Sequence, residues 1–217
     1  DPAVALHLPT QKVVVDSING ISVNDTQNKA TLQAGSIATI CGHIEGNNDF
    51  TGLVSATIRD SRELITCNMN ASAAADSAFA FYDYTKYLFN GSDSIKNGKF
   101  NISFAVPLDI NYSDKAGIMN FHAVSSDKQM LAHGYCTNFI VGGTAAVDND
   151  SIGPSIYCYL NSPSFVNGGN VNSTPYFVAQ ITDANGINST GNGIGHDLQL
   201  IIDGDMAKTY TLNDNFV

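Results

Sequence analysis

The sequence has few basic residues and no long apolar run, and these two absences exclude two kinds of partner. Lys and Arg number 10 in 217 residues against 20 Asp and Glu, which gives a formal net charge of -10 at pH 7 and a pI near 4.6. Nucleic acid is not expected as a partner, because phosphate backbones attract basic surfaces. No segment approaches the roughly 20 apolar residues of a membrane-spanning helix.

Signals for export and for metal binding are also missing. The first ten residues, DPAVALHLPT, have neither the basic start nor the long apolar run of a signal peptide. No C-x-x-C pair occurs, and the histidines are scattered along the chain, so no metal site and no cofactor is predicted. The histidines are His7, His43, His122, His133 and His196.

Cysteine is scarce, with four residues that stand singly in apolar or strand-like segments: Cys41, Cys67, Cys136 and Cys158. We expect free, buried thiols, because an isolated Cys behaves as a small hydrophobic residue. In an exported chain disulfides are the alternative, and sequence cannot choose among the three complete pairings. Cys41 and His43 would share one face of a strand, which makes them the best local Cys/His pair, but we predict no catalytic residue.

Helical periodicity is nearly absent, and period-two alternation takes its place. Two segments carry the clearest strand pattern, 52–60 and 98–107, because every second residue in each is apolar. The residues predicted to face inward are Val54, Ala56, Ile58, Phe100, Ile102, Phe104 and Val106. Further strands are expected in 12–15, 20–23, 36–45, 63–68, 117–126, 135–141, 155–161, 175–183, 197–204 and 208–212.

The segment before the second of these strands predicts a hairpin. Asn97 and Gly98 form the dipeptide that type I′ turns prefer, and a strand is expected in 84–91. These features indicate a hairpin with a long tip. The alanines of 70–84 favour helix, but we interpret this segment as a loop that enters a strand.

Small and polar residues in 143–153 predict a linker between two β modules. The expected fold class is all-β, with an immunoglobulin-like β-sandwich over 16–142 and a second, apparently truncated β-sandwich over 154–217. The second segment is shorter than the roughly 100 residues of a complete immunoglobulin-like sandwich. An incomplete sandwich leaves an unpaired edge, so we expect self-association through this module.

A loop rich in Gly and Asn, 183–197, is the strongest local candidate for a cation site. Its oxygen-bearing side chains Asp183, Asn185, Asn188 and Asp197 are of the type that Ca²⁺ prefers. The register of an EF-hand loop is not met, because a third acidic ligand and a terminal Glu are missing. A structural connection between strands is therefore favoured over a calcium site, and His196 beside Asp197 is interpreted as a turn residue.

Several segments together resemble one family. The start, DPAVALHLP, is similar to the final strand of gingipain-type cysteine peptidase domains, so residues 1–15 are expected to be the last strand of an upstream peptidase domain. The segments GSIATICGHIE, NGKFNISFAVPLDINYSDKAGIMNFHAV and GYCTNFIVGG, followed by GPSIYCYLNSPSFVNGGN, resemble the C-terminal region of the PorU family. Members of that family are sortases of the type IX secretion system.

The resemblance implies a longer cell-surface protein that removes the C-terminal signal of secreted cargo and attaches the cargo to lipopolysaccharide. The catalytic His and Cys of that family lie before Asp1, so this fragment is expected to be no enzyme itself. It implies export to the outer-membrane surface, and as partners the upstream peptidase domain, secretion components or cargo. Asp-Ser-hydrophobic triplets suggest O-glycan acceptors at Ser17, Ser94 and Ser151.

Two other functions stay open from the residues alone. The first is an exported carbohydrate- or protein-binding module, with an aromatic platform of Tyr82, Tyr84, Tyr87 and Phe89, although core packing is the usual use of such residues. The second is an autonomous hydrolase. No assembled Cys/His or carboxylate set supports it, so it is the weakest of the three.

Overall fold

A computed structural model describes residues 8–67, 78–146, 153–184, 186–187 and 197–216. Strands and two short 3₁₀ turns make up its regular structure, so the predicted all-β class is confirmed. The chain divides into two compact units, residues 1–146 with 188–217 and residues 147–187. The predicted boundaries at 16–142, 143–153 and 154–217 remain a prediction. No helix among the described residues has the length and apolar character to cross a membrane.

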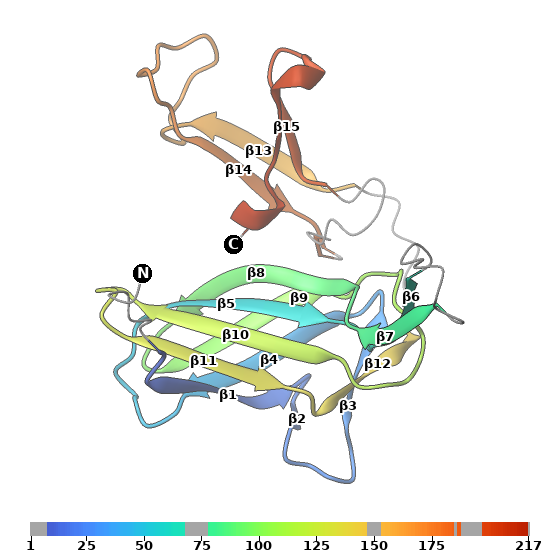
Figure 1. Cartoon of the computed structure of the whole chain (residues 1–217). Coiled ribbons are helices and arrows are strands. Elements are labelled where there is room, and N and C mark those ends of the chain that lie inside the picture. Colours follow the sequence, from blue (N-terminus) through green and yellow to red (C-terminus); the bar gives the residue numbers. More distant parts are fainter. Residues whose placement is uncertain (1–7, 68–77, 147–152, 185, 188–196, 217) are drawn as a thin grey trace. The chain divides into compact units, whose positions relative to one another are not determined.

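One sheet of eight strands dominates the described residues of the first unit (Figure 1). Its strands follow the order β8 (Tyr87–Ile95), β5 (Gly52–Arg59), β10 (Ile118–Ser125), β11 (Leu131–Cys136), β1 (Gln11–Ile18), β4 (Ile37–Ile44) and β9 (Lys99–Ala105), with β2 (Ile21–Ser22) paired to β1. The sheet folds over on itself into a nearly closed sandwich, and the predicted sandwich fold is confirmed.

The two ends of this strand order meet at a tight turn. Asn97 and Gly98 have φ of 52° and 70°, the conformation that the Asn-Gly pair predicts. The predicted long tip is wrong, because β8 continues to Ile95 and only two residues separate the paired Lys96 and Lys99. Beyond the turn, β8 pairs with β5 and β9 pairs with β4. The two strands therefore complete different sides of the sandwich.

Strand β1 belongs to both sides of the sandwich. Gln11 and Lys12 pair in parallel with β11, whereas the strand from Val13 onward pairs antiparallel with β4. The β1–β4 register shifts between Val15 and Ser17. This bulge inserts one residue into the alternation, so that Val13, Val15 and Ile18 all face the core.

The core contains the residues that the alternation predicts. Strands β5 and β9 bury every second side chain, because one face of each is covered by the opposite side of the sandwich. Burial of one such aliphatic or aromatic side chain stabilises the fold by about 1.5–3 kcal/mol. The confirmed inward residues are Val54, Ala56, Ile58, Phe100, Ile102, Phe104 and Val106, and Phe89 stacks on Phe104 with a centroid distance of 4.8 Å.

Two further sheets accompany the sandwich. Strand β3 (Ala30–Ala34), which the sequence analysis did not predict, pairs in parallel with β12 (Phe139–Thr144) and buries Leu32 and Phe139 completely. Strand β6 (Glu63–Cys67) pairs antiparallel with β7 (Phe79–Asp83). The strand expected at the end of 70–84 is thus confirmed, while residues 70–77 lie outside the described residues.

The segments after residue 152 form two-stranded sheets. Strand β13 (Ser155–Leu160) pairs with β14 (Phe177–Thr182), and β15 (Gln199–Ile201) pairs with β16 (Thr209–Thr211). Two 3₁₀ turns, η1 (Met206–Lys208) and η2 (Asn213–Asn215), flank β16. The predicted strands of this region are confirmed, but no side chain of β13 or β14 is fully buried.

Candidate functional site

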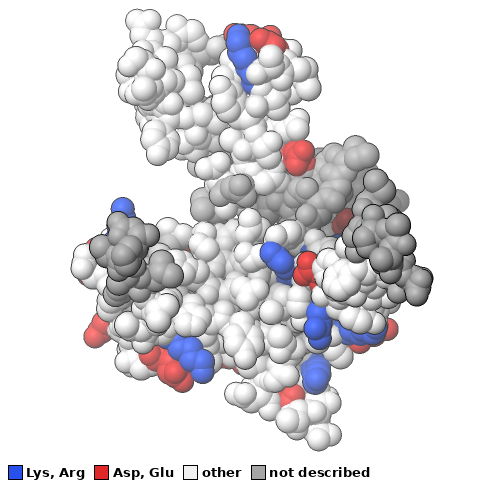
Figure 2. All heavy atoms as spheres, in the orientation of Figure 1, with Lys and Arg blue, Asp and Glu red and all other residues white. Residues whose placement is uncertain are grey.

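Polar side chains line the outside of the sandwich along β8, β5, β10 and β11. Nearly all of them alternate with a buried neighbour, and Ser92 is placed on the same face because it is the register partner of Ser55. Charged side chains are scattered among uncharged ones on the face of the molecule that Figure 2 shows. We call the following residues the outer polar face: Ser55, Thr57, Asn90, Ser92, Asn120, His122, His133 and Tyr135.

Cross-strand hydrogen bonds order part of this face. Ser55 Oγ lies 2.9 Å from Ser92 Oγ, and Thr57 Oγ1 donates to Asn90 Oδ1 at 3.1 Å. Tyr135 is 72% exposed and lies opposite Asn120. Side chains that pair directly across strands stabilise the sheet by about 0.2–1 kcal/mol each. This half of the face is therefore a fixed polar surface with one exposed aromatic ring.

The strand pairing also brings two histidines together. His122 of β10 and His133 of β11 are directly opposite each other, although eleven positions separate them in the sequence. Both are exposed, and their neighbours Phe121, Ala123 and Ala132 are buried. The two histidines therefore occupy adjacent positions on the outer polar face. Sequence spacing did not show this, because it depends on the β10–β11 register.

The best local Cys/His pair is separated by other contacts. Cys41 and His43 share the outer face of β4, as predicted, but Cys41 Sγ lies 3.7 Å from Asn101 Oδ1. The ring of His43 is held by Asp16, whose two carboxylate oxygens each lie 3.0 Å from Nδ1. Asp16 occupies the β1 bulge, which turns its side chain toward β4. The geometry is that of a surface ion pair, not of an activated thiol.

All four cysteines are free, as expected, but only one is buried. Cys136 is 8% exposed, Cys41 and Cys67 are half-buried, and Cys158 is exposed. The prediction of buried thiols is therefore wrong for the last three. Burial raises the pKa of the Cys136 thiol, which a hydrogen bond from the backbone of Asn138 only partly offsets.

The four aromatic residues considered for a platform have different roles. Phe89 is in the core, and Tyr87 is half-buried under the guanidinium of Arg59, which lies 4.5 Å from the ring centroid. Tyr84 faces Arg62 at 5.6 Å. Tyr82 is 65% exposed on β7. They do not form one flat surface, because β7 and β8 belong to different sheets.

Exposed apolar side chains instead gather on the β6–β7 hairpin. Leu64, Phe79, Phe81 and Tyr82 are 55%, 60%, 39% and 65% exposed. Phe79 and Phe81 lie on one face with ring centroids 5.9 Å apart, and Leu64 is opposite Tyr82. We call these four residues the aromatic hairpin. Phe79 and Phe81 lie on one face of this two-stranded sheet and Leu64 and Tyr82 on the other, so both faces expose apolar side chains of the kind that marks interaction surfaces.

One buried carboxylate was missed by the sequence analysis. Asp60 is fully buried, and its two oxygens accept hydrogen bonds from the backbone amides of Ser61 at 2.5 Å and Asn111 at 2.6 Å. Asn111 Nδ2 donates to the Ser61 carbonyl at 3.0 Å, and Ser61 Oγ lies 2.6 Å from Ser113 Oγ. Asp60 therefore fixes the segment after β9 to the end of β5, a structural role that no local motif indicates.

The candidate glycan acceptors lie in unlike places. Ser17 is half-buried in β1, and Ser94 is exposed in β8, with its amide bonded to Asp93 Oδ1 at 2.6 Å. Ser151 lies outside the described residues. Modification at these positions remains a prediction.

The calcium loop is also only partly described. Asn185, Asn188 and His196 lie outside the described residues, while Asp183 follows β14 and Asp197 precedes β15. Within the described residues no three His, Cys, Asp or Glu side chains gather in a way that could hold a metal ion. The favoured interpretation as a structural connection and the alternative of a calcium site therefore both stay untested.

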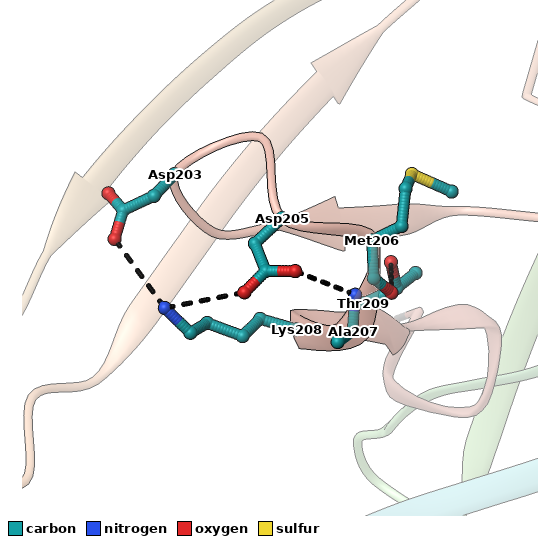
Figure 3. A network of polar contacts seen from close by, with 6 residues as sticks. All are labelled: Asp203, Asp205, Met206, Ala207, Lys208 and Thr209. Carbon is teal, nitrogen blue, oxygen red and sulfur yellow. Dashed lines mark hydrogen bonds and ion pairs between the residues drawn. The ribbon is translucent and has the colours of Figure 1, made fainter.

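The carboxylates of Asp203 and Asp205, in the β15–β16 turn that follows the calcium loop, are already paired with Lys208 (Figure 3). Lys208 Nζ lies 4.0 Å from Asp203 and 3.6 Å from Asp205, and the other Asp205 oxygen accepts from the Ala207 amide at 3.0 Å. Asp203 and Gly204 have φ of 56° and 70°. These contacts cap η1 and close the hairpin, so this acidic pair is part of a turn.

Among solved structures, this chain is similar to a PorU protein over nearly its whole length. The crystal structure of dimeric latent PorU from Porphyromonas gingivalis is 33% identical and matches 98% of this chain with a TM-score of 0.64. The chain spans 20% of the length of that PorU chain. Spo0M, a sporulation control protein from Bacillus subtilis, is 14% identical over 63% of this chain and 51% of its own, with a TM-score of 0.38, too low to support an argument. No protein-family model and no curated protein matches.

Proposed function

Because the chain is PorU-like over nearly its whole length, we propose that it forms non-catalytic support and docking domains of a type IX secretion sortase. The observation that carries this proposal is 33% identity over 98% of the chain. The predicted resemblance to the PorU family is confirmed. In this proposal the peptidase and cargo-attaching activities belong to the longer protein, of which this region resembles one fifth.

The first unit is suited to a positional role. Its nearly closed sandwich contains a continuous core from β1 to β12, and Asp60 fixes the segment between β9 and β10. Such a body changes shape little, since close-packed interiors do not deform continuously. A peptidase domain joined to it would be held at a defined distance from whatever the sandwich binds.

The aromatic hairpin is the proposed contact surface for secretion components or cargo. Its side chains are large, apolar and exposed, and aromatic residues supply much of the binding energy of protein interfaces. Within the described residues the β6–β7 sheet has two strands, so its edges also present backbone groups that an incoming strand can pair with.

The test uses the full-length protein in its host. A variant with Leu64→Ser, Phe79→Ser and Tyr82→Ser is compared with a control that carries Val166→Ser and Leu108→Ser, two residues that are 72% and 64% exposed and lie outside both proposed contact surfaces. We expect the first variant to leave cargo with its C-terminal signal intact, while cleavage of a short peptide stays normal. Normal cargo maturation in the hairpin variant would exclude this surface, and a loss of peptide cleavage would indicate a catalytic defect.

Self-association through the predicted second module, 154–217, is a separate part of the proposal. Ile156, Tyr157 and Tyr176 are 60%, 50% and 78% exposed on or beside the β13–β14 sheet, and a two-stranded sheet alone is marginally stable in water. A second copy of the chain could cover these side chains. Analytical ultracentrifugation should show a sedimentation coefficient that rises with concentration, and a concentration-independent monomer would contradict it.

Export to the outer-membrane surface is a further part of the proposal, supported by the same likeness, and is tested in intact cells. A membrane-impermeant biotin reagent should label the protein before lysis, whereas protection equal to that of a periplasmic marker would contradict surface exposure.

The mass of the host protein tests the acceptor residues, because O-glycans at Ser17, Ser94 or Ser151 would add sugar masses to the sequence mass.

A further inference from the structure

We propose that His122 and His133 form a two-histidine chelate for a divalent transition-metal ion, of the class of Zn²⁺, Ni²⁺ and Cu²⁺. The proposal rests on the cross-strand position of the two side chains and is independent of the sortase function. Imidazole is a preferred ligand of these ions and a poor one for Ca²⁺ and Mg²⁺, which take oxygen ligands. Two imidazoles that stand side by side can bind one ion together.

The register fixes the distance between the two residues. The Ser125 amide donates to the Met130 carbonyl at 3.0 Å, just beyond the β10–β11 ladder. Hydrogen-bonded and non-hydrogen-bonded pairs alternate along an antiparallel ladder, so Val124 and Leu131 form a non-hydrogen-bonded pair and His122 and His133 another.

Strand β5, the other neighbour of β10, also indicates that His122 and His133 form a non-hydrogen-bonded pair. The Ser126 amide donates to the Thr51 carbonyl at 2.9 Å, which places the backbone groups of His122 toward Ser55 of β5 and not toward β11. Non-hydrogen-bonded partners are the closer kind, with Cα atoms about 4.5 Å apart. Two ligand nitrogens at 2.0–2.1 Å from a tetrahedral ion are about 3 Å apart, which rings on such adjacent backbones can reach.

Both rings are available for an ion. Within the described part of the chain neither ring has a hydrogen-bond or ion-pair partner, whereas His43 is occupied by Asp16. Both residues are exposed, so water can complete the coordination shell. The site has two protein ligands, consistent with the absence of any three-ligand cluster among the described residues. It should therefore be open and of modest affinity.

One neighbouring charge opposes binding. Lys12 of β1 is the register partner of His133 on the side away from His122, and it is exposed. Two charges about 4 Å apart interact by about 1 kcal/mol in water, and the long Lys side chain can turn away. The net charge of -10 acts in the opposite direction over longer distances. Replacing Lys12 with Gln should therefore tighten metal binding.

The test is calorimetric titration of the untagged chain with NiCl₂ and ZnCl₂. We expect one ion per chain, no heat with MgCl₂, and at least tenfold weaker binding in each of His122→Gln and His133→Gln. The control variants His43→Gln, His7→Gln and His196→Gln should bind as the parent does. Circular dichroism should show an unchanged fold, because both positions are exposed.

Two results would overturn the proposal. The first is metal binding that His122→Gln and His133→Gln leave unchanged. The second is an equal loss in His43→Gln, which would indicate separate single-histidine contacts. Retention on a nickel column provides an independent readout. If the two histidines chelate together, His122→Gln alone should elute at as low an imidazole concentration as the variant that lacks both histidines.

Discussion

The sandwich and the β13–β14 sheet both contain strands with apolar side chains but have different burial. Strand β5 reads GLVSATIR and buries Val54, Ala56 and Ile58, while β13 reads SIYCYL and leaves Ile156 and Tyr157 largely exposed. Strand β5 alternates apolar and polar residues from Val54 to Arg59, whereas β13 is apolar or aromatic from Ile156 to Leu160. Each pattern predicts a strand, but whether its apolar side chains are covered depends on a second layer that local sequence does not reveal.

The largest expected difference between the two regions comes from the same substitution made in each. Ile58 is completely buried and Ile156 is 60% exposed. Ile58→Ala should lower the free energy of unfolding of the sandwich by about 2–5 kcal/mol, because it removes buried methyl groups and leaves a cavity. Ile156→Ala should change it by less than about 0.5 kcal/mol.

Urea unfolding followed by circular dichroism measures both variants. Equal losses in the two would mean that β13 is covered in solution, which would support self-association. An unaffected Ile58→Ala variant would mean that the sandwich core is not as tightly packed as its burial indicates.

Two aspartates give the next difference. Asp60 is fully buried and accepts two backbone hydrogen bonds, whereas Asp203 is exposed beside Lys208. Asp60→Ala should destabilise the sandwich by roughly 1.5–3 kcal/mol, since the amides of Ser61 and Asn111 lose a charged acceptor. Asp203→Ala should have little measurable effect. Thermal unfolding of the two variants checks this, and a stable Asp60→Ala variant would contradict the anchoring role.

A pair of glycines tests backbone packing. A Cβ at Gly134 would lie 2.0 Å from the Val13 carbonyl oxygen, where β11 meets β1, whereas a Cβ at Gly153 would meet no atom within 4 Å. Gly134→Ala should cost about 1–3 kcal/mol because one of the two strands must shift. Gly153→Ala should be close to neutral. Denaturant midpoints of both variants measure the contrast, and a neutral Gly134→Ala would show that β1 and β11 separate easily.

The least perturbing comparison uses the native thiols. Cys158 is exposed and should react with iodoacetamide in the folded chain. Cys136 should react only as the chain unfolds, because burial both excludes the reagent and raises the pKa of the thiol, so that less thiolate is present at a given pH. Peptide mass mapping after timed labelling distinguishes them. Rapid labelling of Cys136 would show that the end of β11 opens in the native state.

The sequence predicted the faces of single strands better than their partners. The inward residues of β5 and β9 and the Asn97-Gly98 turn were correct, because both depend on neighbours in the chain. Strand β3 was missed, since two of its three buried residues are Ala and its polar residues are Thr31 and Gln33. The long hairpin tip was wrong because β8 and β9 diverge to different partners after a tight turn.

The site residues show the same limit. Cys41 and His43 lie on one face of β4, as the two-residue spacing predicts, but their contacts with Asn101 and Asp16 depend on neighbouring strands. The pairing of His122 with His133 depends on one register, which no spacing rule contains. Asp60 was missed because its role depends on the backbone amide of Asn111, 51 residues later.

The shared pairing of β1 has a mechanical consequence. Its first residues are bonded to β11 and its later residues to β4, and a force along the strand would have to break these backbone hydrogen bonds together. Strand β12 is likewise held in parallel by β3. Tension applied between these two strands would therefore load both ladders in shear, a geometry that resists stretching far better than the peeling of a hairpin.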